Sequence, residues 1–129
     1  MALNFVSTGR APKAIGPYSQ DIEVRAARTL WLSGQIPLDP ATGELVKGHI
    51  EEETARVMEN LKAVLSAGGA TFEHVVKCTI YLADLGDFAK VNEVYGRYFP
   101  GIPPARATVQ VAGLPRGARV EIDAVAVVD

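Results

Sequence analysis

Hydrophobic residues in the middle of the chain recur at helical spacing, with glutamates before them and two glycines after them. The apolar positions of this stretch are Val57, Met58, Leu61, Val64 and Leu65. Residues three or four apart share one face of a helix, so the pattern predicts an amphipathic helix that ends at Gly68-Gly69. A second helix is predicted over about 87–99, where Phe88, Val91, Tyr95 and Tyr98 repeat every three or four positions and Asp84 or Asp87 supplies a cap.

Other stretches alternate between apolar and polar residues, or are rich in β-branched and aromatic residues, and are predicted to be strands. In residues 74–83 the alternation puts Val76, Cys78, Ile80 and Leu82 on one face. Residues 20–26 and 29–36 are predicted to form a hairpin through "RAAR", although this turn has no Gly or Asn. The proline-containing segment 37–45 is predicted to be a loop. Two further strands, 106–111 and 119–128, are joined by the long connection 112–118.

Two helices that each carry one apolar stripe predict an α+β fold in which both cover one face of a mixed sheet. The other face is also apolar: in the last strand Val125 and Val127 alternate with Ala124 and Ala126. Because two helices do not bury both faces, we expect the second face to pack against other copies of the chain.

The composition describes an ordinary single domain that spans residues 1–129. Basic and acidic residues are interspersed, and the net charge of -2 and pI of about 5.7 argue against nucleic-acid binding. No stretch approaches the roughly 18 apolar residues of a membrane span or resembles a signal peptide, so a cytoplasmic location is expected. The single Cys78 and the isolated His49 and His74 predict neither a disulfide nor a metal site.

Arg106 is the only charged residue between Phe99 and Pro115. On its predicted strand, Thr108 and Gln110 share its face, and Ala107 and the following valines face the core. One interpretation is a solvated strand face on which Arg106 pairs with Glu121 or Asp123. The other is an anion-binding site, since a guanidinium presents a planar fork of donors that suits a carboxylate.

Several segments, taken in order, resemble the motifs of the RidA/YjgF family of enamine and imine deaminases. The segments are "IGPYSQ", "SGQIPLDPATGEL", "ENLKAVLSAGGA", "VVKCTIYLADLGDFAKVNEVYGRYF", "PPARATVQV" and "VEIDAVAV". The resemblance covers about residues 15–127. It implies a chorismate-mutase-like α+β subunit with a mixed six-stranded sheet, two helices packed on one face, and a trimeric barrel with active sites between subunits.

The resemblance also implies a reaction, namely the hydrolysis of small 2-imino acids and their enamine tautomers to 2-keto acids and ammonia, with no cofactor or metal. Arg106 would bind the substrate carboxylate and Glu121 would orient the attacking water, helped by backbone groups near Thr108. Tyr18 is expected to be catalytic or to line the pocket. Ser33, Gly34 and Asn92 match further positions around the substrate, and some of these residues are expected to come from a neighbouring subunit.

One position departs from the family pattern, because many members carry cysteine where this chain has Thr108. Imine hydrolysis does not require that thiol, but thiol-based redox activation at this position is in doubt. The alternative is a non-catalytic trimer that binds small molecules or proteins, as a chaperone does. A ribonuclease function, attributed to some members, is disfavoured by the acidic pI and by the lack of a basic aromatic groove.

Overall fold

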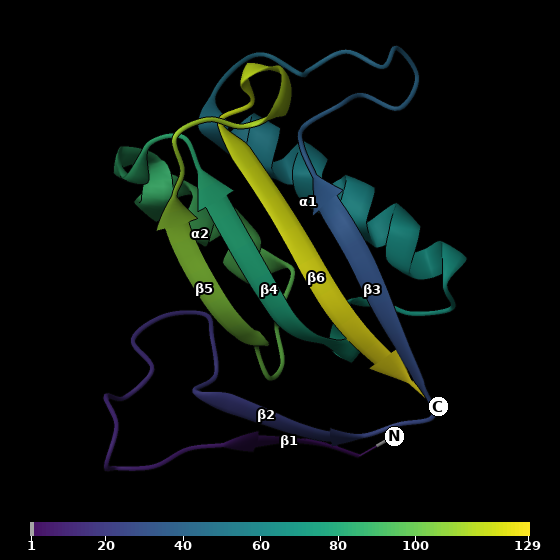
Figure 1. Ribbon diagram of the computed structural model, residues 1–129, viewed down its shortest axis with the longest axis vertical. Coiled ribbons are helices and arrows are strands. Elements are labelled where there is room, and N and C mark those ends of the chain that lie inside the picture. Colours follow the sequence, from purple (N-terminus) through teal and green to yellow (C-terminus); the bar gives the residue numbers. More distant parts are fainter. Residues whose placement is uncertain (1) are drawn as a thin grey trace.

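The computed structural model describes residues 2–129, and its centre is a four-stranded sheet in the order β3-β6-β4-β5. The strands are β3 (Arg28–Gln35), β6 (Val120–Val128), β4 (Val75–Leu82) and β5 (Ala105–Gln110). β4 and β5 run parallel, and the other neighbouring pairs are antiparallel. The helices α1 (Ile50–Ala67) and α2 (Phe88–Arg97) both lie on one face of this sheet (Figure 1). The predicted α+β fold with two helices on one face of a mixed sheet is confirmed.

The N-terminal strands form a separate two-stranded sheet, which lies apart from the larger one (Figure 1). β1 (Ala2–Val6) pairs antiparallel with β2 (Asp21–Arg25) along its whole length. The predicted hairpin between residues 20–26 and 29–36 is therefore wrong, and so is a single six-stranded sheet, because the six strands are divided between two sheets. The physical reason is that "RAAR" has no residue that favours a tight turn, while β1 satisfies the backbone groups of β2.

Helix α1 follows the prediction, with glutamates in its first turn and Gly68 at its end. Four of the five predicted positions are buried, whereas Val64 is 43% exposed because it lies at the edge of the apolar stripe. A side chain on Gly68 would approach Leu30 of β3 to 2.8 Å, so the glycine permits close packing of the helix end on the sheet. In α2, Val91 and Tyr95 are buried as expected. Of the two predicted caps, Asp87 occupies the N-cap position without a side-chain hydrogen bond, and Asp84 caps the short 3-10 turn Leu85–Asp87 that precedes the helix.

Strand β4 buries Cys78, Ile80 and Leu82 as predicted, but Val75 joins the core in place of Val76. The pairing of β4 with β6 shifts register between Val75 and Lys77. This irregularity inserts one residue and breaks the strict alternation.

The predicted faces of β5 are inverted. Arg106 and Thr108 lie on the helix face, whereas Ala107 and Val109 lie on the open face and are exposed. β5 is an edge strand of the sheet, so its apolar residues do not have to face the helices of the same chain. The open face also carries Trp31, which is 79% exposed. Among residues 2–129, no helix is long and apolar enough to cross a membrane.

Candidate functional site

Arg106 lies near the start of β5, in register with Cys78 of β4, and its guanidinium is surrounded by aromatic rings. Its Cζ lies 5.3 Å from the ring centre of Tyr95, 5.4 Å from that of Tyr18 and 5.6 Å from that of Phe88. Each such contact attracts the cation to the negative face of the ring. The rings also remove water, and this burial lowers the pKa of the Arg106 guanidinium from its ordinary value. The charge is therefore held in an environment that is largely apolar.

Helix α2 supplies most of this environment because three of its residues are spaced to share one face. Phe88, Asn92 and Tyr95 are at positions i, i+4 and i+7 and point toward β5. The Arg106 Nη1 donates a hydrogen bond of 2.6 Å to Asn92 Oδ1. Asn92 thus fixes one branch of the guanidinium. Phe88 and Tyr95 were not among the predicted site residues, although their place on the Asn92 face of an amphipathic helix was the signal that could have identified them.

Within residues 2–128, the Arg106 side chain donates a hydrogen bond to Asn92 and to no other residue. The ion pairs within residues 2–128 are Arg97 with Glu93 and Arg119 with Glu53, and neither includes Arg106. The Nε and Nη2 groups make no hydrogen bond within the same residues. A half-buried cation with free donors and no carboxylate beside it is suited to an anionic ligand. The interpretation in which Arg106 pairs with Glu121 or Asp123 on a solvated face is wrong.

Two unpaired hydroxyl groups neighbour this guanidinium. In the part of the chain that the structure describes, the buried side-chain polar atoms without a hydrogen-bond partner are Tyr95 Oη and Thr108 Oγ1. Thr108 lies two residues after Arg106 on the same strand face, and burial raises the pKa of the Tyr95 phenol, which stays protonated. The Tyr95 hydroxyl faces the Cys78 thiol, a weak hydrogen-bonding partner that also contributes to the raised pKa of the phenol. The Thr108 hydroxyl has no such neighbour among the described residues, and buried groups of this kind are normally satisfied by water or by a ligand.

Glu121 belongs to a second cluster on the opposite face of the sheet. β3 carries one extra residue between Leu32 and Gln35, which places Ser33 and Gly34 beside β6 as a bulge. The Glu121 carboxylate lies against Gly34 so closely that a Cβ on this glycine would be 2.9 Å from the Glu121 Cδ and would overlap its Oε2. Glu121 itself makes no hydrogen bond within residues 2–128, which leaves its oxygens free to accept one.

Asp123 and Tyr81 lie in the same cluster and were missed by the sequence analysis as a pair. The Tyr81 Oη donates to Asp123 Oδ2 at 3.0 Å, and the Thr79 backbone N–H donates to Asp123 Oδ1 at 3.1 Å. The hydrogen bond to Asp123 raises the pKa of the Tyr81 phenol. Tyr81 is also in register with Glu121, so the two side chains lie on the same open face of the sheet.

The structure therefore divides the predicted site residues into two groups. Arg106, Asn92, Thr108 and Tyr18 lie together on the helix face, and Ser33, Gly34 and Glu121 lie together on the open face. β4 separates the strands that carry Arg106 and Glu121. Within one chain these two residues do not face a common substrate. Tyr18, which was expected to be catalytic or to line the pocket, lies beside Arg106.

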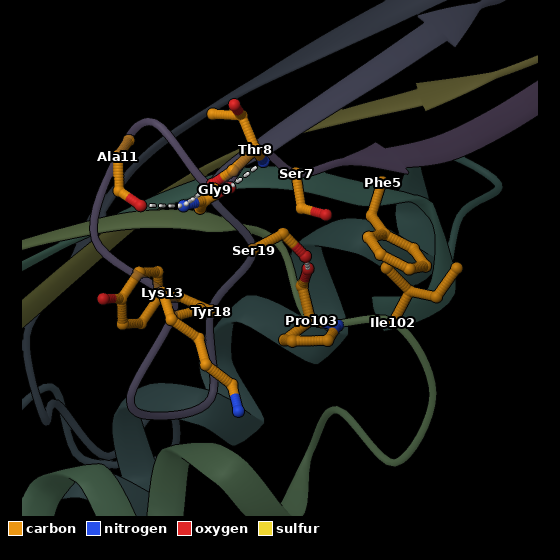
Figure 2. A pocket seen from close by; sticks show the side chains of 12 residues that line it. Phe5, Ser7, Thr8, Gly9, Ala11, Lys13, Tyr18, Ser19, Ile102 and Pro103 are labelled. Atoms are coloured by element: carbon orange, nitrogen blue, oxygen red, sulfur yellow. Dashed lines mark hydrogen bonds between the residues drawn. The ribbon is translucent and has the colours of Figure 1, made fainter.

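A cavity of about 690 Å³ lies under the N-terminal segment, lined by residues of 5–20 together with Ile102 and Pro103 (Figure 2). Tyr18 is the one predicted site residue that lines it. Its wall is otherwise mostly apolar or small, and Lys13 is the one charged lining residue. The cavity therefore does not contain the Arg106 guanidinium.

Cys78 lies beneath the site and is expected to be unreactive. Burial raises the pKa of its thiol to about 12, so at pH 8 roughly one thiol in ten thousand is ionised. We predict that the native protein will not react with a disulfide reagent such as dithionitrobenzoate during one hour at pH 8. After unfolding in urea, the one thiol of the protein is expected to react and to release one equivalent of thionitrobenzoate. Stoichiometric reaction of the native protein would contradict the burial.

Comparison with known proteins identifies the family. Two helices on one face of a mixed sheet, with an arginine on the helix face and a glutamate on the opposite face, define a small α+β protein. Residues 8–128 match the Endoribonuclease L-PSP family, so the chain belongs to this family, which is the RidA/YjgF family that the motifs predicted.

Three relatives illustrate the match. The protein DfrA of Myxococcus xanthus is 66% identical over 127 residues, covering 98% of this chain and 97% of the relative. A 2-iminobutanoate/2-iminopropanoate deaminase of Mus musculus is 54% identical over 122 residues, 95% of this chain and 89% of the relative. The crystal structure of E. coli TdcF with bound serine has a TM-score of 0.74 and 39% identity, and the match covers 98% of this chain and 99% of that chain.

Proposed function

We propose that this protein hydrolyses reactive 2-imino acids, such as the tautomers of 2-aminoacrylate and 2-aminocrotonate, to 2-keto acids and ammonia. The observation that carries this proposal is the half-buried Arg106 guanidinium, which within residues 2–128 has free donors and no carboxylate partner. Every 2-imino acid has a carboxylate next to the reacting carbon. Binding of that carboxylate would place the C=N group at a fixed distance from the arginine.

In this proposal the substrate carboxylate binds donors of Arg106 that Asn92 does not use. Asn92 holds Nη1, and Nε and Nη2 remain for two parallel hydrogen bonds to the two carboxylate oxygens. The aromatic rings of Tyr18, Phe88 and Tyr95 restrict the guanidinium before the substrate arrives, which reduces the entropy cost of binding. The unpaired Thr108 hydroxyl lies next along the strand and is a partner for a polar atom of the substrate or for a water.

Glu121 is proposed to orient the water that adds to the electrophilic carbon of the protonated imine. Water supplies the oxygen of the keto group, and one of its protons passes through the carboxylate to the nitrogen. When the C–N bond of the resulting N-protonated carbinolamine breaks, ammonia leaves and takes up the remaining hydroxyl proton, which gives the 2-keto acid and ammonium. The reaction needs no redox step. The enzyme contributes mainly by holding substrate and water in one geometry.

Because Arg106 and Glu121 lie on different faces of one chain, we propose that each active site is built from two copies. The Arg106 cluster of one copy would meet the Ser33, Gly34 and Glu121 cluster of the next, in a trimer whose open sheet faces pack together. The exposure of Trp31 and Val109 on that face supports burial against another copy. A monomeric species by light scattering at micromolar concentration would contradict this assembly.

The comparisons support the reaction class. The Mus musculus relative is named as a deaminase of 2-iminobutanoate and 2-iminopropanoate, and the E. coli TdcF structure holds serine, which carries the same carboxylate and α-nitrogen arrangement. The Myxococcus xanthus relative has a name that states no reaction, so a direct assay is needed.

The test is a coupled assay in which a threonine or serine dehydratase generates the imine and semicarbazide traps what is not hydrolysed. The wild-type protein is expected to suppress trapping in a concentration-dependent and saturable way. If it leaves trapping unchanged but binds 2-oxobutanoate, the chain is a non-catalytic binding protein of this family, and the proposed reaction is wrong.

The two-copy site is tested by mixing two inactive variants. Arg106→Ala lacks the carboxylate grip and Glu121→Gln lacks the water-orienting group, so neither trimer alone has an intact site. After unfolding and refolding together in equal amounts, random assembly gives one site in four with both native residues, so about a quarter of wild-type activity is expected to return. Recovery of no activity, with mixed trimers shown by mass spectrometry, would place both residues of each site in one chain.

A further inference from the structure

The segment that carries Tyr18 is tied to the strand that carries Arg106 by residues that the proposed function does not use. Ser19 directly follows Tyr18, and Pro103 and Pro104 precede Arg106 by three and two positions. Ser19 Oγ donates to the Pro103 carbonyl at 2.6 Å, as Figure 2 shows, and its backbone N–H donates to the Pro104 carbonyl at 3.1 Å. Ser19 thus joins two segments that are more than 80 positions apart in the sequence.

Ser19 is one of three buried polar residues in the described chain, and the burial is explained by these two bonds. The other two, Glu53 and Thr54, have partners that belong to helix α1 and its surroundings. A buried hydroxyl costs free energy unless it is hydrogen-bonded, so the Pro103 carbonyl determines where the Ser19 side chain can lie. Pro103 and Pro104 have no backbone N–H to donate, but their carbonyl groups accept the two hydrogen bonds from Ser19.

The same segment is fitted to helix α2 on its other side. A Cβ on Gly96 would lie 3.5 Å from the Pro17 Cβ, an ordinary van der Waals distance, which shows that Pro17 packs beside helix α2 at this position. Gly16 also lies close to the guanidinium, since a Cβ there would be 3.8 Å from Arg106 Nη2. Residues Gly16 to Ser19 therefore cross the Arg106 cluster, with Pro17 against α2 and Ser19 bonded to the residues before β5.

We propose that Ser19 is a positioning residue for the carboxylate site, because its two hydrogen bonds hold the Tyr18 ring over the Arg106 guanidinium. This inference rests on the proposed function only for the identity of the ligand. Without the Ser19 hydroxyl, the segment keeps its backbone bond to Pro104 but loses the side-chain anchor. The Tyr18 ring then leaves the guanidinium more often, water reaches the cation, and the carboxylate ligand binds less tightly.

The test compares Ser19→Ala and Ser19→Thr with the wild type, with Ser66→Ala on the exposed face of α1 as the matched control. Affinity for 2-oxobutanoate is measured by calorimetry, and protection of the residue 19 amide is measured by hydrogen exchange without ligand. Ser19→Ala is expected to weaken binding about tenfold and to speed exchange by a similar factor, as loss of one buried hydrogen bond implies. Ser19→Thr keeps the hydroxyl, so its ligand affinity and its amide exchange rate are both expected to lie within about threefold of the wild-type values.

Steady-state kinetics distinguish an effect of Ser19 on substrate binding from an effect on the chemical step. In the coupled assay Ser19→Ala is expected to raise KM about tenfold and to leave kcat within about twofold, because the water-orienting Glu121 cluster is unchanged. Binding and amide exchange in Ser19→Ala that match the wild type would overturn the positioning role. Since neither readout needs turnover, a wild type that binds 2-oxobutanoate but does not hydrolyse imines would contradict only the proposed reaction. A wild type that does not bind 2-oxobutanoate would overturn both.

Discussion

Arg106→Ala is expected to reduce kcat/KM for imine hydrolysis by at least about 100-fold, since two charge-assisted hydrogen bonds to the substrate carboxylate are lost. Arg106→Lys should recover only part of this loss, because an ammonium group does not present the planar fork of a guanidinium. The measurement is the coupled assay across a range of protein concentrations, with 2-oxobutanoate affinity as a second readout. Both variants are expected to lose affinity.

The control is an arginine of the same neighbourhood that has no part in the site. Arg97 lies on the exposed side of α2 and pairs with Glu93, with side-chain exposures of 65% and 68%. Arg97→Ala is therefore expected to have wild-type kinetics and a similar melting temperature. Arg106→Ala should keep the same circular dichroism spectrum and oligomeric state. If Arg106→Ala dissociates into monomers, Arg106 supports assembly, and the loss of activity no longer identifies a carboxylate grip.

The sequence predicted the helices well because their apolar residues repeat over several turns. Met58, Leu61 and Leu65 each occupy the face of α1 that packs on the sheet, and Gly68 ends the helix as expected. The pattern of β4 was correct from Cys78 onward. It failed at Val76 because a single inserted residue reverses the two faces of a strand, and alternation does not reveal such an insertion.

The faces of β5 were inverted for a different reason. Alternation shows that Arg106 and Thr108 share a face, but it does not say which face the helices cover. Valine and alanine normally indicate the interior. On an edge strand, however, they also occur on the face that is open within one chain, and in the proposed trimer this face would pack against other copies. Here Val109 is exposed and Arg106 is covered by aromatic rings of α2.

The family motifs implied the residues of the candidate site and a location between subunits, but not which of these residues lie together within one chain. Sequence order suggested that Arg106 and Glu121 could approach each other across the loop 112–118. The structure inserts β4 between their strands and places the two side chains on opposite faces. A parallel pairing between β4 and β5 leaves no local signal in the sequence, since it joins segments that are almost 30 residues apart. The separation of the two side chains within one chain is the basis of the proposed two-copy site, a location that the family resemblance also implied.

Gly34→Ala is expected to damage catalysis through the Glu121 carboxylate. A methyl group at this position overlaps Oε2 and would be 2.9 Å from Cδ, so the carboxylate has to move away from its place on the open face. A shift of about 1 Å in a catalytic group costs about 100-fold, so a fall in kcat of this order is expected. Glu121→Gln is expected to cause a similar or larger fall, while both variants keep their affinity for 2-oxobutanoate, which depends on the Arg106 cluster.

A double-mutant cycle shows whether Gly34 acts through Glu121. If the methyl group harms activity only by displacing the carboxylate, Gly34→Ala should cost less than about threefold when it is added to Glu121→Ala, in which the side chain it would displace is absent. Gly113→Ala is the matched control, because a Cβ there has no atom within 4 Å. Additive losses would mean that Gly34 contributes independently, for example through its backbone. An unchanged kcat in Glu121→Gln would remove Glu121 from the mechanism, and with it the reason that a second copy is needed to complete the site.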